Sequence, residues 1–313
     1  MTDSEIPEPG AGEITIDVEA AGVGLIDAFW ATGVMPQHEG FIPGIEVAGT
    51  VRAIGGGDIS LVVGQRVAAL LPGAGGFAEV VRARMDLVAP IPGGMSSAQA
   101  AVVPINTVTA HLALTRVARC EAGETVLVHA GIGGLGSQFG QIARVLGASR
   151  VDAVVGTPDK QQAALELGYD NAYLRKDLSA IHAGTYDIVV DPVGGEATRD
   201  AFRVLRGGGR MLRVGNASQS ADVSVSTMAH WLENKTTAGF NVGAWLGTHP
   251  EQGADSLRWA LTAVADGSVR VDLTATTQLG DQDSLISDLL AGRTTGKVAI
   301  VMRSSTALRA HVQ

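Results

Sequence analysis

Three glycines shortly after an apolar run have the spacing GxGxxG, which is typical of a turn that binds dinucleotide phosphates. Residues 126–129 predict a strand, and Gly131, Gly133 and Gly136 follow it. Gly131 would allow a tight turn, Gly133 would let the backbone approach a pyrophosphate, and Gly136 would let the next helix pack closely. The spacing alone is a weak signal in a chain with 41 glycines, so the flanking elements decide its interpretation.

A predicted helix follows the glycine turn. Its apolar residues recur at helical spacing until Gly147, where the helix is expected to end, and they are Phe139, Ile142, Ala143 and Leu146. Gly134 and Leu135 lie just before this helix, whose first N–H groups lack intrahelical partners and would bind phosphates. Strand, turn and helix together predict a dinucleotide site, and the alternative is a glycine-rich surface turn.

The end of the next predicted strand indicates which dinucleotide is bound. NAD-selective folds place an Asp or Glu there for the ribose 2′-hydroxyl, whereas a 2′-phosphate needs space and a cation. This chain has Gly156 and Thr157 there, with Lys160 in the first turn of the following helix. We therefore expect NADPH, with Lys160 as a solvated helix residue as the alternative. Asp152 lies within the strand, and Asp159 is expected to cap the helix.

Two patterns of predicted elements divide the chain. Residues 11–110 alternate short strands with glycine turns, which indicates a compact, barrel-like β-domain with strands at 14–18, 47–51, 66–70 and 77–81. From residue 125 strands and helices alternate, which predicts a doubly wound parallel sheet. Its strands are expected at 125–129, 151–155, 187–190 and 210–214, and its helices at 136–146, 159–167 and 196–205. Helices near 254–265 and 284–291 and a strand at 298–302 then rejoin the first domain.

The length of the chain supports the same division. With 313 residues it is longer than a typical single domain. We expect an α/β protein in which residues 1–106 and 244–313 form a β-rich substrate domain. Residues 107–243 would form the nucleotide-binding domain.

Composition excludes several classes of partner. The net charge is −9 and there is no basic block, so we expect neither nucleic acid nor an anionic membrane surface as a partner. Cys120 is the single cysteine, which excludes an intrachain disulfide framework and a cysteine-rich zinc site. No apolar run approaches membrane-spanning length. We expect a soluble, cytoplasmic protein.

A series of motifs occurs in order along nearly the whole chain. They are AGV at 21–23, IPGIEVAG at 42–49, VGQRV at 63–67, GFAE at 76–79, PINTVTA at 104–110, GETVLVHA at 123–130, DPVGG at 191–195 and TGKV at 295–298, together with Gln141 and Arg144. In these residues the chain resembles the medium-chain dehydrogenase/reductase superfamily, and within it the zinc-independent quinone oxidoreductases related to zeta-crystallin. Ile132 departs from the small residue usual there. The resemblance implies a GroES-like catalytic domain and a Rossmann domain.

The resemblance also implies positions for the cofactor contacts. They are Thr109 near the nicotinamide, Gly156, Thr157 and Lys160 near the 2′-phosphate, Gly215 and Asn216 near a ribose, Phe240, Asn241 and Val242 bordering the nicotinamide, and Lys297 near the interdomain cleft. Arg175 is our own inference. It falls where relatives often place Tyr or His against the 2′-phosphate, and a guanidinium would bind that group by charge-assisted hydrogen bonds. The alternative is a solvated charge beside Lys176.

Residues that zinc would need are missing. Zinc alcohol dehydrogenases of this superfamily have Cys and His where this chain has Gly24 and Ile45. With one distant Cys and seven scattered His, the sequence offers no zinc ligand set, and we expect no bound metal. His129, at the end of a predicted strand, and His111, in a predicted helix, are expected to be structural.

Without a metal, the expected chemistry is hydride transfer from NADPH to a quinone or to an enone or enal, which conjugation already activates. Charge that develops on the substrate oxygen needs a hydrogen-bond donor or water. Tyr169, Tyr173 and Tyr186 all fall in the predicted nucleotide domain. Thr109, a backbone N–H or solvent would therefore have to serve, and Thr109 is the one candidate catalytic residue.

The candidate substrate pocket lies in the first domain. Gly24 stands where quinone reductases of this family usually have Asn. Phe29, Trp30 and Met35 would line an apolar pocket beside it, although each is also a candidate core residue. Asp27 could be a capping or loop carboxylate.

Two other functions stay open. One is an enoyl reductase that acts on thioesters, and the other is a non-catalytic NADP-binding protein. The resemblance implies a homodimer. In this family an opening pair of strands usually precedes the equivalent of residues 7–13, so we expect either an uncovered sheet edge that favours association or an upstream start.

Overall fold

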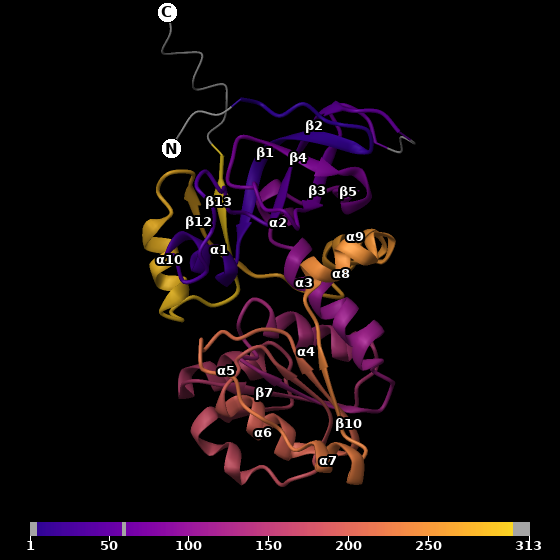
Figure 1. The fold of residues 1–313 in the computed structure, drawn as a ribbon, viewed down its shortest axis with the longest axis vertical. Coiled ribbons are helices and arrows are strands. Elements are labelled where there is room, and N and C mark those ends of the chain that lie inside the picture. The colour runs from indigo at the N-terminus through magenta and orange to yellow at the C-terminus, as the bar shows by residue number, and fades with distance from the viewer. Residues whose placement is uncertain (1–4, 58–60, 303–313) are drawn as a thin grey trace, which may run out of the picture. The chain divides into compact units, whose positions relative to one another are not determined.

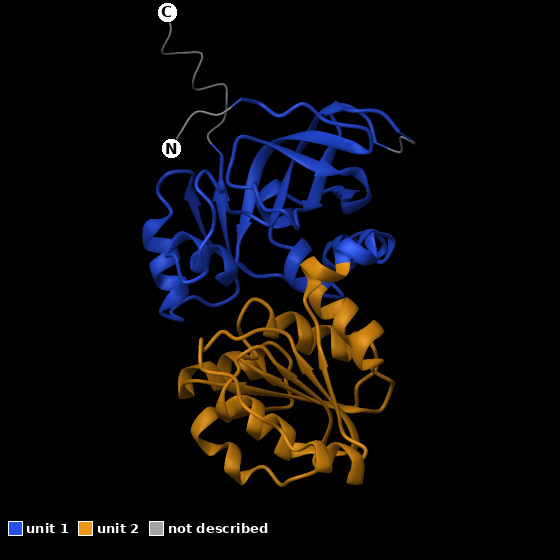
Figure 2. Cartoon of the chain, viewed as in Figure 1, with its two compact units in different colours: residues 1–108, 246–313 blue, residues 109–245 orange. Residues whose placement is uncertain are grey.

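The structure is a computed structural model that describes residues 5–57 and 61–302. The chain forms two compact units, residues 1–108 with 246–313 (unit 1) and residues 109–245 (unit 2), coloured separately in Figure 2. These boundaries lie two residues beyond those expected from the sequence. Unit 1 is therefore built from both ends of the chain, and unit 2 from one continuous segment.

Unit 1 is built on a mixed sheet in which β1 is central. The strands are β1 (Glu13–Val23), β2 (Glu46–Ile54), β3 (Arg66–Leu70), β4 (Val80–Arg84), β5 (Val88–Pro90), β12 (Leu273–Gln278) and β13 (Lys297–Val301). Their order is β12-β13-β1-β2-β3-β5, and β4 also pairs with β1. One edge of β1 pairs with β2, and the other pairs first with β4 and then with β13, so Figure 1 shows both ends of the chain in one sheet.

The core of unit 1 joins these distant strands. Ile16, Val47 and Val67 pack with Ile300 in one buried cluster, because alternate residues of each strand face the same side. The helical segments assigned to this unit are α1 (Leu25–Ala31), α2 (Ser97–Ala100), α9 (Pro250–Ala265), α10 (Asp283–Leu290) and the 3₁₀ turn η1 (Met85–Leu87). Helices α3 (Pro104–Leu112) and α8 (Val242–Thr248) span the boundaries between the units.

The strand expected at 77–81 is wrong in its position, because β4 begins only at Val80. The N–H groups of Gly75, Gly76 and Phe77 donate instead to carbonyls of residues 42–44. This segment therefore belongs to a loop pair, and pairing with β1 begins at Asp17 and Val80.

Unit 2 is a parallel sheet with helices between its strands. The strands are β6 (Thr125–His129), β7 (Arg150–Val155), β8 (Asn171–Leu174), β9 (Tyr186–Asp191), β10 (Leu205–Arg213) and β11 (Thr236–Gly239). Their order is β11-β10-β9-β6-β7-β8, so the connection reverses direction at β6. The helical segments are α4 (Gly136–Val145), α5 (Pro158–Glu166), α6 (Glu196–Val204), α7 (Thr227–Leu232), the π-helix η2 (Ala113–Ala118) and the 3₁₀ helix η3 (Arg175–Ala180).

This arrangement confirms the expected α/β class and parallel sheet. Helix α4 packs on β6 and β7, α5 on β7 and β8, and α6 on β9 and β10. Ligands of such sheets bind outside the carboxyl ends of the strands, where the strand order reverses. In unit 2 this point lies between β6 and β9.

Candidate active site

The glycine turn joins β6 to α4 through a close approach of backbones. Ala130 has a φ of 53°, and its carbonyl accepts from the N–H of Gly133 at 2.9 Å. A Cβ on Gly136 would lie 2.2 Å from the Ala130 oxygen, and one on Gly131 would lie 2.6 Å from the Cβ of Ala153. Gly131 and Gly136 therefore leave no room for a side chain. The crowding at Gly136 agrees with the close helix packing expected there, whereas Gly131 is crowded by Ala153 of β7 and its part in a tight turn stays a prediction.

The residues between these glycines also form part of the turn. The Gly134 carbonyl accepts from Ser137 Oγ at 3.2 Å, and Leu135 precedes the first residue of α4. A Cβ on Gly133 would lie 3.3 Å from the Ala130 oxygen, which is a tight contact, although its backbone is less crowded than that of Gly136.

Tyr169 holds this turn from the other side of α4, a role that sequence reasoning missed. Its hydroxyl lies 2.9 Å from the Gly131 carbonyl oxygen and 2.8 Å from that of Gly136, and it donates to this pair. A Cβ on Gly140 would lie 2.4 Å from the Tyr169 ring and hydroxyl, so Gly140 makes space for the ring. Burial raises the pKa of Tyr169, which keeps the donor protonated. The signal in the sequence is the pair Gly136 and Gly140, one helical turn apart.

Asp191, the last residue of β9, organises the switch point. One carboxylate oxygen accepts from the N–H groups of Val193 and Gly194 at 2.8 and 3.0 Å. The other accepts from Thr198 Oγ1 at 2.6 Å and from the Arg213 guanidinium at 2.5 Å. Burial alone would raise the pKa of Asp191, but the Thr198 and Gly194 hydrogen bonds and the charge of Arg213 hold it below its ordinary value. Sequence reasoning missed Arg213, which ends β10 beside it.

His129 ends β6 next to this cluster and is 1% exposed. Burial lowers its pKa to about 4; Asp191 opposes this shift, and Arg175 and Arg213 add to it. His129 is therefore neutral at neutral pH, and its Nε2 has no hydrogen-bond partner among the described residues. His111 is also shifted to about 4, mainly by burial. Both histidines are held in the neutral form.

The carboxyl end of β7 is open where the 2′-phosphate site is expected. A Cβ on Gly156 would meet nothing within 4 Å, and Thr157 precedes α5, where Lys160 lies in the first turn. Val155 pairs with Leu174 in β8, so the next residues, Gly156 and Arg175, leave the sheet side by side.

Of the two nearby acids, Asp152 is engaged inside the sheet, and Asp159 belongs to the first turn of α5. Asp152 lies inside β7, is fully buried, and accepts from Tyr186 Oη at 2.6 Å and from Asn171 Nδ2 at 3.0 Å. Asp159 lies in the first turn of α5, where a negative charge stabilises the helix. The exposed Arg175 and the half-buried Lys160 thus flank the end of β7. NAD-selective folds have an Asp or Glu at this strand end for the ribose 2′-hydroxyl, and this chain has Gly156 there.

The remaining cofactor candidates lie near other strand ends. After β10, the side chain of Asn216 donates to the Ser220 carbonyl at 3.0 Å, and a Cβ on Gly215 would lie 3.1 Å from the Pro192 carbonyl oxygen. After β11, Phe240 is buried and its N–H donates to the Arg213 carbonyl at 2.9 Å.

The last two candidates of unit 2 lie at its borders. Asn241 Oδ1 accepts from the Ala244 N–H at 3.0 Å at the start of α8, whose first residue is Val242. Thr109 is 7% exposed and begins unit 2 within α3. The structure thus places these candidates in one unit, and their contacts with a cofactor stay predictions.

In unit 1, Asp27 holds two backbone segments together. One of its carboxylate oxygens accepts from the Gly24 N–H at 2.8 Å, which caps α1, and the other from the Gly44 N–H at 2.8 Å. The carboxylate is fully buried. Burial raises its pKa from 3.8 to about 6, the Gly24 and Gly44 hydrogen bonds and Lys297 lower it, and Glu46 raises it. Asp27 thus has the capping role that the sequence left open.

Lys297 forms a buried ion pair, although the sequence suggested a cofactor contact. Its Nζ donates to Glu46 Oε1 at 2.6 Å, and the two side chains are 4% and 0% exposed. The other Glu46 oxygen accepts from the Ile105 N–H at 2.8 Å, in the first turn of α3. A Cβ on Gly22 would lie 2.4 Å from Glu46 Oε1, so Gly22 makes room for this pair. Lys297 is thus engaged inside unit 1, and its contact with a cofactor stays a prediction.

The substrate candidates lie along α1 and the loop after it. Gly24 precedes the helix and has space for a side chain, because an added Cβ would only reach 3.5 Å from Asp27 Oδ2. Trp30 packs edge-on against Phe41 with ring centroids 5.0 Å apart. Phe29 is half-buried, and Met35 is 41% exposed. The structure therefore places all four in unit 1, and their contact with a substrate stays a prediction.

Within residues 5–57 and 61–302, no group of three or more His, Cys, Asp or Glu side chains could hold a metal ion. No helix in the described part of the chain is both long and apolar enough to cross a membrane.

Comparisons with known proteins agree with this geometry. The model of the alcohol dehydrogenase GroES-like domain matches residues 10–93, and that of the zinc-binding dehydrogenase matches residues 134–261. A probable oxidoreductase from Mycobacterium abscessus is 31% identical, with 96% of this chain and 93% of that chain covered and a TM-score of 0.82. Two mycobacterial structures at 28% identity cover 96% of this chain and 94% of theirs; one is complexed with NADPH (TM-score 0.86) and the other is named a quinone oxidoreductase (0.84).

Curated relatives include much longer proteins. The phthioceranic/hydroxyphthioceranic acid synthase of Mycobacterium bovis is 31% identical over 273 residues, which are 83% of this chain. The chain spans only 13% of the length of that relative.

These matches show the family. The chain belongs to the medium-chain dehydrogenase/reductase superfamily. Within it, the motifs predict the zinc-independent quinone oxidoreductase type, and one of the structures at 28% identity carries the name quinone oxidoreductase.

Proposed function

We propose that this protein is an NADPH-dependent oxidoreductase that transfers a hydride, without zinc, to a quinone or to an α,β-unsaturated carbonyl compound. The observation that carries the proposal is the open end of β7. Gly156 leaves space there, Arg175 leaves the sheet beside it, and Lys160 begins the next helix. Space and two cations suit a 2′-phosphate, whereas NAD would need a carboxylate at this end.

The turn after β6 would hold the pyrophosphate. Gly131 and Gly136 bring β6 and α4 together, so the positive end of the α4 dipole lies at the turn, where the N–H groups of Ser137 and Gln138 donate to the carbonyls of Gly133 and Leu135. Tyr169 fixes the carbonyls of Gly131 and Gly136 through its hydroxyl. Because the turn is held before binding, ordering it adds little to the cost of binding the cofactor.

Bound NADPH would supply a hydride to the conjugated carbon of the acceptor, and a proton would complete the reduction. None of the three tyrosines belongs to unit 1, and Tyr169 is committed to the glycine turn. Thr109, a backbone N–H or solvent would therefore supply the hydrogen bond and the proton. Gly24 adds no donor, in contrast to the Asn usual in the family.

A second candidate is the reduction of enoyl thioesters. It is favoured by the curated relatives, which include mycobacterial acid and polyketide synthases. The hydride step would be the same, and the substrate would be an unsaturated acyl thioester. A third candidate, a non-catalytic NADPH-binding protein, rests on the missing side chain at Gly24.

We also propose that two copies associate through the edge of unit 2. Strand β11 is the last strand of its sheet, so one edge is open among the described residues. Helix α7 precedes it and exposes Met228, Trp231 and Leu232 at 55%, 72% and 66%. Open sheet edges and clustered apolar side chains both favour association.

We further propose that the protein is located in the cytoplasm.

The test of the function is NADPH oxidation with quinones, enals, enones and an enoyl thioester, beside NADH and after treatment with a chelator. Turnover that is selective for NADPH and resists the chelator supports the proposal, and the best acceptor identifies the substrate class. Tight NADPH binding without turnover of any acceptor would favour the non-catalytic alternative. Loss of turnover after chelation would contradict the zinc-free chemistry.

The test of the cofactor site is Arg175→Ser, with Lys176→Ser as the matched control next to it. Hydrogen bonds to charged groups contribute about 1.5–3 kcal/mol, so Arg175→Ser is expected to raise the KM for NADPH at least about tenfold. The KM for NADH should not change, and Lys176→Ser should have little effect on either. Equal effects of the two substitutions would show a general charge effect and refute the assignment.

A further inference from the structure

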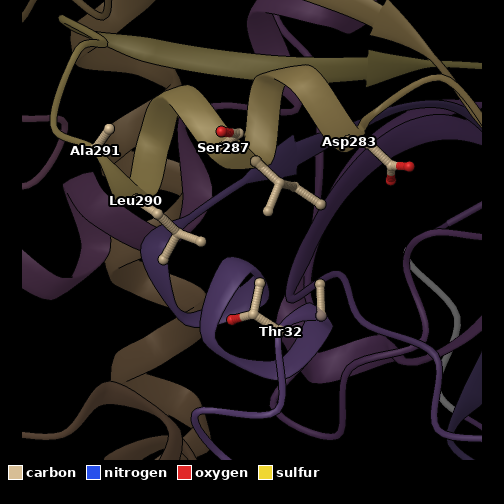
Figure 3. Close-up of a pocket in the computed structure, with 7 residues that line it drawn as sticks. Thr32, Asp283, Ser287, Leu290 and Ala291 are labelled. Atoms are coloured by element: carbon tan, nitrogen blue, oxygen red, sulfur yellow. The ribbon is translucent and has the colours of Figure 1, made fainter.

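A pocket in unit 1 lies outside the site described above. It has a volume of about 490 Å³ and lies between the end of α1 and helix α10. Figure 3 shows Leu290 on α10 and Thr32 at the end of α1 on its two sides. This volume is within the range of roughly 300–1,000 Å³ that is usual for small-molecule sites.

The chemistry of the walls suits a neutral, apolar ligand. Ala31, Ile286 and Leu290 supply apolar surface, and the Thr32 hydroxyl is already used, because it donates to the Ala28 carbonyl at 2.7 Å. The one charged residue among the pocket's lining residues is Asp283, which would repel a phosphate or carboxylate. A hydrocarbon chain is therefore better suited to this pocket than an anionic group.

The position of the pocket relates it to the candidate substrate residues. Gly24 precedes α1 and Ala31 ends it, so the helix separates them by about 10 Å at about 1.5 Å per residue. An extended chain advances about 1.2 Å per bond, as the backbone does, so about eight bonds span this distance. Phe29 and Trp30 lie between the two points on the same helix.

We infer that the pocket between α1 and α10 binds the linear alkyl chain of an α,β-unsaturated substrate whose reacting end lies near Gly24. This rests on the proposed function and names its substrate class: enones or enoyl compounds with a long saturated tail. Val34 and Met35, which follow Thr32 in the chain and are 46% and 41% exposed, would extend the apolar surface beside the tail.

The test measures the kinetics of NADPH-dependent reduction for linear enones of increasing chain length. Below about eight carbons the KM should change little, because the chain does not reach the pocket. Beyond that length each added methylene should lower the KM by up to about fourfold until the pocket is full, with kcat unchanged.

Leu290→Trp, which fills the pocket, should abolish the gain for long chains and leave short enones unaffected. Thr32→Trp, from the opposite wall, should do the same, so the test does not depend on one variant. The matched control is Leu165→Trp, which alters a leucine 45% exposed on α5 of unit 2. A KM that is independent of chain length, or a gain that survives both pocket variants, overturns the inference.

Failure of the proposed function would look different, since short enones would then not be reduced at all. In that case the pocket is tested directly by calorimetry with 1-decanol and 1-butanol. Binding of decanol that Leu290→Trp abolishes would still support an alkyl site. Absence of decanol binding would refute it, whatever the catalytic activity. If the pocket bound another protein instead of an alkyl chain, the mass of this chain in solution would increase in the presence of that protein. This result would also count against the inference.

Discussion

Asp27 gives the sharpest prediction of the structure, because a buried carboxylate here is stabilised only by backbone groups and one nearby cation. Its pKa rises from 3.8 to about 6, chiefly through burial, while the N–H groups of Gly24 and Gly44 limit the rise. The folded protein therefore keeps the Asp27 proton at pH values where the unfolded chain has lost it. The free energy of unfolding should fall as the pH rises from about 3.8 to about 6.

The size of this effect follows from the two pKa values. A difference of this size corresponds to about 3 kcal/mol, and the change between about pH 4 and about pH 7.5 should be between about 2 and 3 kcal/mol. The Asn side chain of Asp27→Asn does not titrate, so residue 27 makes no pH-dependent contribution to the free energy of unfolding of this variant. Its stability relative to the parent protein should therefore rise by that amount across the range.

The assay is urea unfolding of both proteins over this pH range, with stability expressed as the difference between them at each pH. Other titrating groups cancel in this difference, because they are present in both proteins. Asp222→Asn, the same substitution at an exposed position, is the control. A constant difference for Asp27→Asn would refute the reasoning, because burial would then not shift this carboxyl.

Two further predictions concern the ion pair and the open sheet edge. Glu46→Gln or Lys297→Met alone should lower the free energy of unfolding by about 3–5 kcal/mol, because each leaves a buried charge, and the double variant should lose less than the sum. Arg293→Met, in the exposed pair with Asp288, should cost at most about 1 kcal/mol in the same urea assay, and equal losses would contradict the role of burial. Trp231→Ser should weaken a dimer at least about thirtyfold in analytical ultracentrifugation, as expected for a hot-spot residue, whereas Leu165→Ser should not. A monomeric parent protein would refute the β11 interface.

The sequence predicted long, apolar elements well. Strands β6 and β7 lie close to the expected positions, because buried parallel strands are almost continuously apolar. Helix α4 (Gly136–Val145) also lies close to its expected position, because Gly147, with a φ of 89°, ends it. The short strands β8, β11 and β12 were not predicted. Residues 236–239, for example, read TTAG and are mostly exposed, so no apolar pattern marks them.

The candidate site was predictable only where chemistry follows from local spacing. The glycine turn and Asp152 could be placed from neighbours along the chain. The contacts of Tyr169 with Gly131, 38 residues away, and of Lys297 with Glu46, 251 residues away, depend on tertiary packing. A single sequence contains no signal for pairs at such separations, so the ion pair of Lys297 with Glu46 was not predicted.

The separation of Glu46 and Lys297 also bears on the order in which the chain folds during synthesis. Unit 2 is continuous from residue 109 to 245 and can form as soon as that segment has left the ribosome. Unit 1 has to wait, because β1 lacks its partner β13, and Glu46 its counter-charge, until Lys297 has been made. In the interval the first hundred residues present an unpaired strand edge and a carboxylate that cannot yet be buried. We expect chaperone contact during synthesis to concentrate on this amino-terminal segment, and a chain that stalls before residue 297 to contain a folded unit 2 beside an unfinished unit 1.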